Sequence, residues 1–135
     1  MAIFNGFCDR VPMLLIGATG PLAADSRRPW IDWIHTASDM PALVRDFVKW
    51  DDQPTTVRAS VDSILRANQL TRAYPHAPTF VCVDAAVQEQ RVASWKSRDA
   101  RRYRPPRDPL RTRTRSSKRR VCWPAPPARS SWPGA

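Results

Sequence analysis

The sequence predicts an α/β fold over residues 1–90, in which a partial parallel sheet is flanked by helices, and a disordered basic tail over residues 91–135. Helix-like and strand-like segments alternate in the first part, and its strand-like segments are continuous apolar runs, which is typical of strands covered on both faces. The charge also changes sharply: residues 1–90 contain eight Lys+Arg and ten Asp+Glu, whereas residues 91–135 contain 14 and two. The net charge of +10 therefore describes neither part.

The first predicted elements are a helix over residues 2–8, closed by Asp9 and Arg10, and a buried strand over residues 12–17. Residues 17–21 (Gly-Ala-Thr-Gly-Pro) are predicted to end this strand in a turn. A glycine-containing turn after a strand is also where phosphate loops occur. However, this turn lacks both the later Gly-Lys-Ser/Thr of a P-loop and the third glycine of a dinucleotide fingerprint, so we favour a plain turn.

Two Asp-x-Pro sequences predict the starts of later helices. Asp39 and Asp52 can each accept backbone N–H groups, while the proline two residues on occupies the first turn. The first of these helices is short, residues 41–45, and leads into a short strand at 46–50. The second extends over residues 54–73, and the paired acids before it are interpreted as a cap and not as a catalytic pair.

The long helix and the strand after it complete the predicted sheet. The helix has a stripe that is apolar until its last turn, formed by Val57, Val61, Ile64, Leu65 and Asn68. Residues 79–83 are a further apolar strand that ends at Asp84. The order helix, strand, helix, strand, helix, strand predicts parallel pairing.

Composition excludes several classes of protein. No apolar run approaches the roughly 20 residues that span a bilayer, so no membrane partner is expected. A signal peptide at residues 11–24 is disfavoured because Asp9 cancels Arg10 before the run and two glycines interrupt it. The three cysteines are widely spaced and odd in number, which predicts neither a zinc site nor a disulfide framework and favours a reducing, cytoplasmic setting.

His35 lies in a segment rich in aromatic residues, between Pro29 and Thr36. It has two interpretations: a general acid/base or substrate contact in a cleft between Trp30 and Trp33, or an interfacial histidine among packing tryptophans. The second is favoured, because no Cys, His or carboxylate lies at metal-ligand spacing. His76, between two prolines, is interpreted as a loop residue.

The basic tail also has two interpretations. The arginine runs at residues 101–104 and 111–120 can bind nucleic-acid phosphates nonspecifically, with base stacking by Tyr103 and Trp123. Alternatively, the mixture of Arg, Pro, Ser, Trp and Ala resembles a GC-rich gene translated in the wrong frame. We favour the frame-shift interpretation, because the composition changes abruptly near residues 92–97.

Four elements of residues 1–90 follow one another in an order that has a known counterpart. The first is a helix-to-strand pattern, formed by Ala2, Asp9, Pro12, Leu14, Ile16 and Gly17. Trp33-Ile-His35, Lys49 and the strand at residues 77–84 follow it. This series resembles the N-terminal domain of thiamine-diphosphate-dependent enzymes of the acetolactate synthase and 2-oxo-acid decarboxylase group. The family patterns are "A…A…D..P.L.I.G", an aromatic-Gln-Glu element, a lysine after a short helix, and "GPV.V.IP.D".

The resemblance implies that residues 1–90 are the second half of a pyrimidine-binding domain. Complete relatives are homo-oligomers that form or cleave a carbon–carbon bond beside the carbonyl of a 2-oxo acid, using thiamine diphosphate and Mg²⁺. It makes Trp33 and His35 the candidate residues facing the active site, although His35 replaces the usual Gln or Glu. No catalytic, cofactor-binding or metal-binding residue is assigned.

The family's catalytic glutamate and the Gly-Asp-Gly motif of its diphosphate site have no counterpart here. Glu89, the single glutamate, is at the wrong end of the matched region. We therefore expect this chain alone to bind neither cofactor nor metal and to be inactive. The alternatives are a nucleic-acid-binding protein that uses the basic tail, and a module that docks on a full-length enzyme subunit.

Overall fold

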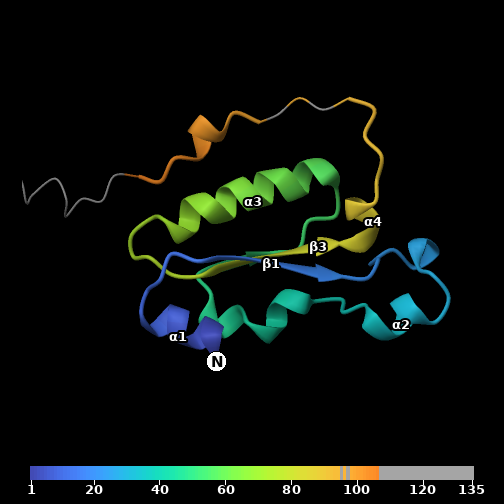
Figure 1. Cartoon of the computed structure of the whole chain (residues 1–135), viewed down its shortest axis with the longest axis horizontal. Coiled ribbons are helices and arrows are strands. Elements are labelled where there is room, and N and C mark those ends of the chain that lie inside the picture. The colour runs from blue at the N-terminus through green and yellow to red at the C-terminus, as the bar shows by residue number, and fades with distance from the viewer. Residues whose placement is uncertain (95, 97, 107–135) are drawn as a thin grey trace, which may run out of the picture.

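The computed structural model describes residues 1–94, 96 and 98–106 (Figure 1). Its helices and strands are α1 (Ala2–Cys8), β1 (Leu14–Thr19), α2 (Ile31–His35), β2 (Trp50–Asp52), α3 (Val57–Thr71), β3 (Thr79–Asp84) and α4 (Ala85–Gln88). Four short 3-10 helices join them: η1 (Ala24–Ser26), η2 (Met40–Leu43), η3 (Arg45–Phe47) and η4 (Ala100–Tyr103). This order confirms an α/β fold.

The three strands form one parallel sheet in the order β1-β3-β2. In Figure 1, α3 covers one face of this sheet, and α1, α2 and the 3-10 helices η2 and η3 lie on the other. β3 is the central strand, and it is buried along most of its length. The prediction of a parallel sheet flanked by helices is therefore confirmed for the part of the chain that the structure describes.

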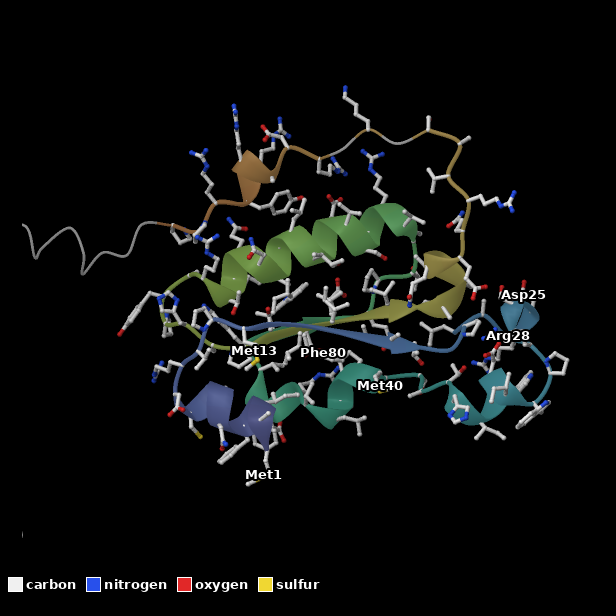
Figure 2. The ribbon with its side chains drawn as sticks, in the orientation of Figure 1. Met1, Met13, Asp25, Arg28, Met40 and Phe80 are labelled. Carbon is white, nitrogen blue, oxygen red and sulfur yellow. The ribbon has the colours of Figure 1, made fainter. Side chains whose placement is uncertain are left out.

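The first helix lies where the sequence predicts it, but the first strand is displaced. β1 begins at Leu14 and continues to Thr19, so Gly17 belongs to the strand and not to a turn. The cause is the length of β3, which pairs with β1 as far as Asp84. Gly17 is needed within the strand because a Cβ there would lie 2.6 Å from the ring of Phe80, which is labelled in Figure 2.

The strand predicted at residues 46–50 is wrong. Residues 45–47 form η3, and β2 begins only at Trp50. The chain first bonds to the β3 segment at Lys49, whose N–H donates to Pro78 O at 2.7 Å, so pairing with β3 starts there. Asp39 does cap its short helix, since its carboxylate accepts the N–H of Ala42 at 3.2 Å.

Asp52 does not cap the long helix, which corrects the second cap prediction. It ends β2, where its carboxylate accepts the N–H of Gln53 and the hydroxyl of Ser63. The cap is Thr56, whose hydroxyl accepts the N–H of Ala59 at 3.2 Å. α3 therefore begins at Val57, three residues later than predicted, because the chain must first leave the sheet edge.

The buried face of α3 differs from the predicted apolar stripe. Its buried residues are small: Ser60, Ser63, Ala67 and Thr71. Of the predicted stripe, only Ile64 packs against the core cluster, which consists of Ala67, Val81 and Val83 and is flanked by Leu14, Trp50 and Val87. The buried hydroxyls are paired, as Thr71 Oγ1 donates to Ala77 O at 2.7 Å. Small side chains thus allow the helix backbone to approach the sheet.

The described part of the predicted tail lies along the outer side of α3 (Figure 1). Arg98 forms an ion pair with Asp62 at 2.9 Å, and the Tyr103 hydroxyl donates to the same carboxylate at 3.1 Å. The Gln69 side-chain amide donates to Arg104 O at 3.0 Å. Residues 107–135, including the arginine run at 111–120 and Trp123, lie outside the described residues. Among the described helices, none has the length and apolar character needed to cross a bilayer.

Candidate functional site at the carboxyl edge of the sheet

Ligands of open parallel α/β sheets bind beyond the carboxyl ends of the strands. Here that edge is formed by polar residues: β1 ends at Thr19, β3 at Asp84 and β2 at Asp52. The register sets Thr19 beside Asp84 and Asp52 beside Val81. The segment that carries α2 leaves β1 at this same edge (Figure 1), so the edge contains both candidate residues of the sequence analysis.

Asp84 joins two segments that are distant in the sequence. It is only 5% exposed. One carboxylate oxygen accepts the N–H of Leu22 at 2.7 Å, and the other accepts the N–H of Ala86 at 2.7 Å and that of Val87 at 3.3 Å. The carboxylate thus caps α4 and holds the loop after β1, which makes it an architectural group at this edge.

Asp32 holds α2 in a comparable way. Its buried carboxylate accepts three bonds from Arg28: from the backbone N–H at 2.8 Å, from Nε at 3.0 Å and from Nη2 at 3.1 Å. Figure 2 shows Arg28 on the segment between β1 and α2. The hydrogen bonds from Arg28 hold the pKa of Asp32 below its usual range. A carboxylate bound on this many sides is not available as a general base.

Trp33 and His35 lie on α2 and both are exposed. Trp33 is 59% exposed, and the Arg27 guanidinium lies 4.8 Å from the centre of its ring. The same guanidinium donates to Pro21 O at 2.8 Å and to Leu22 O at 3.0 Å, so it connects α2 with the loop after β1. His35 has no hydrogen bond within the described part of the chain. The structure therefore brings both candidate residues to the solvent side of the carboxyl edge.

The glycine-containing loop after β1 is filled by protein atoms. A Cβ on Gly20 would overlap the Thr36 hydroxyl oxygen. Thr19 Oγ1 accepts the N–H of Ala37 at 3.1 Å. The loop thus packs against the segment after α2 and does not present a phosphate cradle.

Gln53 is a feature of this edge that sequence reasoning missed. Its side-chain carbonyl accepts the N–H of Met40 at 3.2 Å, while its Nε2 atom is buried and has no partner among the described residues. The second such atom is Nδ1 of His76, the residue interpreted as part of a loop. Nothing in the local sequence marks Gln53, because its environment depends on η2, which is brought to it by the fold.

The remaining candidate groups do not converge on a site. No group of three or more His, Cys, Asp or Glu residues placed to hold a metal occurs among the described residues. Glu89 is exposed at the end of α4. Cys82 is buried, which raises the pKa of its thiol, with a smaller contribution from Asp84, whereas Cys8 is exposed.

A cleft of about 940 Å³ lies elsewhere, between the start of α3 and residues 90–103. Five cationic side chains are among its lining residues: Arg58, Arg91, Lys96, Arg98 and Arg102. Arg98 is paired with Asp62, and Asp99, the one carboxylate among the described lining residues, accepts the N–H of Arg101. The lining of this cleft is therefore strongly basic.

These features define the class of this protein as an α/β protein with a three-stranded parallel sheet packed against helices. No protein-family model matches the chain, and neither a curated protein nor a solved structure matches it significantly.

Proposed function

We propose that residues 1–90 are part of the pyrimidine-binding domain of a thiamine-diphosphate-dependent enzyme that acts on 2-oxo acids. One observation supports this proposal most directly. Two of the segments that carry the resemblance, residues 2–17 and 77–84, contribute the adjacent parallel strands β1 and β3. The chain leaves β1 at their carboxyl edge to reach α2, which presents Trp33 and His35 to solvent. Parallel α/β sheets bind ligands at this edge.

The described residues do not form a complete cofactor site. The buried carboxylates at the carboxyl edge, Asp32 and Asp84, are already bound by Arg28 and by backbone N–H groups. Glu89 is exposed at the end of α4. We therefore assign no catalytic step to this chain. In the proposed enzyme this segment forms one side of the active site, with Trp33 and His35 facing the substrate, and other parts of the enzyme hold the cofactor and Mg²⁺.

A chimeric enzyme tests this proposal. Residues 1–90 replace the corresponding segment of a complete acetolactate synthase, and acetolactate formation from pyruvate is measured with thiamine diphosphate and Mg²⁺. We expect turnover by the chimera, and a drop in kcat/KM of about tenfold or more for His35→Ala, because the lost contact lies at the reacting site. Tyr74→Ala is the matched control, since Tyr74 is also exposed and lies outside this edge. A chimera that folds and binds cofactor, but in which neither Trp33→Ala nor His35→Ala alters turnover, would refute the proposed role.

The purified 135-residue chain provides a second measurement. With pyruvate, thiamine diphosphate and Mg²⁺ we expect neither CO₂ release nor acetolactate, because the described residues form no complete cofactor site. Cofactor-dependent turnover of pyruvate by this chain would contradict the proposal.

Nucleic-acid binding is a second candidate function, and the basic cleft favours it. Arg58, Arg91, Lys96 and Arg102 form no ion pair with other described residues, so their charges are available to phosphate groups. Filter binding of single-stranded DNA across a range of salt concentrations tests this function. The log–log slope should decrease by about one for each lost phosphate contact in Arg58→Gln and Arg91→Gln. It should be unchanged in Arg10→Gln, at an exposed arginine on the loop after α1.

A further inference from the structure

Among the described residues, no strand neighbours the outer edge of β1, since β1 is an edge strand of the three-stranded sheet and pairs with β3. The direction of its backbone groups follows from one bond. Thr79 N–H donates to Met13 O at 2.8 Å, and in a parallel ladder the residues that bond to the neighbouring strand alternate. Leu15 and Gly17 therefore face β3, whereas Leu14, Ile16 and Ala18 direct their N–H and C=O groups to the open edge.

Strand β1 lacks the charged side chains and prolines that usually prevent edge strands from associating. Charged side chains, prolines, bulges or a covering segment protect most exposed edge strands. From Val11 to Ala24 the chain has no charged residue, and prolines occur only at positions 12 and 21, outside β1. The strand itself, Leu14–Thr19, consists of uncharged and mostly apolar residues.

The side chains at the edge are exposed as well. Leu14 packs against the core cluster beneath α3, and Ile16, two residues on, lies on the same face of the sheet. Ile16 is nevertheless 60% exposed, and Ala18 is exposed too. On the face of β1 that is turned towards α3, the apolar side chains after Leu14 are therefore exposed to solvent. Such exposure is unusual for an isoleucine in the middle of a strand.

We propose that a second copy of this chain pairs with this edge in antiparallel fashion, about a two-fold axis that places Ile16 opposite the same residue of the second copy. Outward-facing residues then form the hydrogen-bonded pairs, and Leu14 lies opposite Ala18 of the second copy. The register uses all the outward backbone groups, for about six new hydrogen bonds. A large side chain faces a small one at each flanking pair, including Leu15 opposite Gly17.

A second copy fits this edge for two reasons. The chain has a net charge of +10, yet the edge is neutral, so two copies meet there without bringing like charges together. Two-fold pairing also stops at two copies. It joins the two three-stranded sheets into one, whose outer strand at each end is the three-residue strand β2 with its two aspartates. Short, charged edge strands resist further addition. This interface does not rest on the proposed function.

Analytical ultracentrifugation of the full chain and its variants tests the interface. We expect a dimer at micromolar concentration, and at least about a tenfold rise in the dimer dissociation constant for Ile16→Lys, because two like charges would then meet on the axis. Leu43→Lys is the matched control: Leu43 is 75% exposed on η2, so the same charge is added away from β1, and the dimer should persist. Far-UV circular dichroism confirms folding, and Ala18→Lys replaces Ile16→Lys if that variant does not fold.

Mixing two variants tests the register. Ile16→Lys and Ile16→Glu should each be monomeric, and an equimolar mixture should form a heterodimer, because only self-pairing at position 16 sets lysine opposite glutamate. The inference is overturned by a monomeric wild-type chain, by open-ended oligomers, by a dimer that survives Ile16→Lys, or by variants that fail to associate when mixed.

Discussion

Two buried carboxylates hold the loops at the carboxyl edge of the sheet. Asp32 accepts three bonds from Arg28, and Asp84 accepts three backbone N–H groups from two segments. Removing the buried Asp84 carboxylate leaves backbone N–H groups of two segments without a partner, which is costly, whereas removing the Asp32 carboxylate releases Arg28, whose side chain is 64% exposed. The placement of α2, and with it the exposure of Trp33 and His35, therefore depends on these single residues.

The pH dependence of stability should reveal the bond between Asp32 and Arg28. The pKa of Asp32 is lowered in the folded state from an ordinary value of 3.8, so its stabilising contribution is complete above that pH and is lost as the pH falls through the folded-state value. We expect Asp32→Asn to lower the free energy of unfolding at pH 7, and the difference from wild type to shrink towards about pH 3. Urea unfolding at both pH values measures this. Asp46→Asn, at an exposed aspartate without an ion pair to a described residue, is the control.

The environment of Cys82 should be detectable by its reactivity. Burial raises the pKa of its thiol, and the neighbouring Asp84 adds to this, so little thiolate is present near pH 8. We expect iodoacetamide to label Cys8, which is exposed, much faster than Cys82 in the folded chain, and to label both in urea. Peptide mass mapping follows each site separately. Equal labelling of the two residues in the folded state would show that β3 is accessible to the reagent.

At the scale of elements, α3 shows why the interface between a helix and a sheet is hard to derive from hydropathy. Its apolar stripe predicts a buried face through Val57, Val61 and Leu65, but the buried residues of α3 are small and mostly hydroxylated, and of the stripe only Ile64 packs against the core cluster. The Ser60 and Thr71 hydroxyls donate to backbone carbonyls, Ser60 Oγ to Thr56 O at 2.9 Å, and the Ser63 hydroxyl donates to the Asp52 carboxylate, so their burial leaves no unpaired hydroxyl.

Enlarging this face should destabilise the protein. Ala67 is 0% exposed and part of the core cluster, so Ala67→Leu forces the helix away from β3 at a cost of about 1–3 kcal/mol in the free energy of unfolding. Ala59→Leu, on the same helix but only partly buried, should cost less. Urea denaturation of both variants measures the difference. Equal stability of the two would mean that α3 packs on the sheet with another face.

At the scale of the whole molecule, the described residues after β3 extend the structure beyond the predicted α/β unit. Asp62 binds both Arg98 and Tyr103, and so holds η4 on the outer side of α3. We expect Asp62→Ala to accelerate tryptic cleavage after Arg101 and Arg102, because the segment loses its main polar contact. Limited proteolysis with mass spectrometry measures the rate. Asp25→Ala, at an exposed aspartate of η1 (Figure 2), is the control, and equal rates would contradict this role of Asp62.

Much of the fold can be predicted from the sequence because its signals are local. The helix at residues 2–8, the strand at 79–84 and the Asp39 cap depend on neighbouring residues, and all three are confirmed. The strand at 46–50 and the Asp52 cap are wrong, because both depend on where Lys49 and Asp52 meet β3 and α3. Lys49 illustrates this: its ammonium group donates to three carbonyls at and after the end of α3, 21 to 26 residues away.

The sequence by itself determined the fold class, since continuous apolar runs that alternate with helices are typical of a parallel sheet covered by helices on both faces. Its choice of Trp33 and His35 as candidate site residues stays a prediction. Only the tertiary structure decided which polar groups are already bound, because Leu22 and Asp84 meet across 62 residues. Tertiary structure also decided that β1 is an edge strand with Ile16 exposed. The sequence does not show this, because strand order depends on long-range pairing, and the apolar pattern of a strand is the same at the edge of a sheet as in its centre.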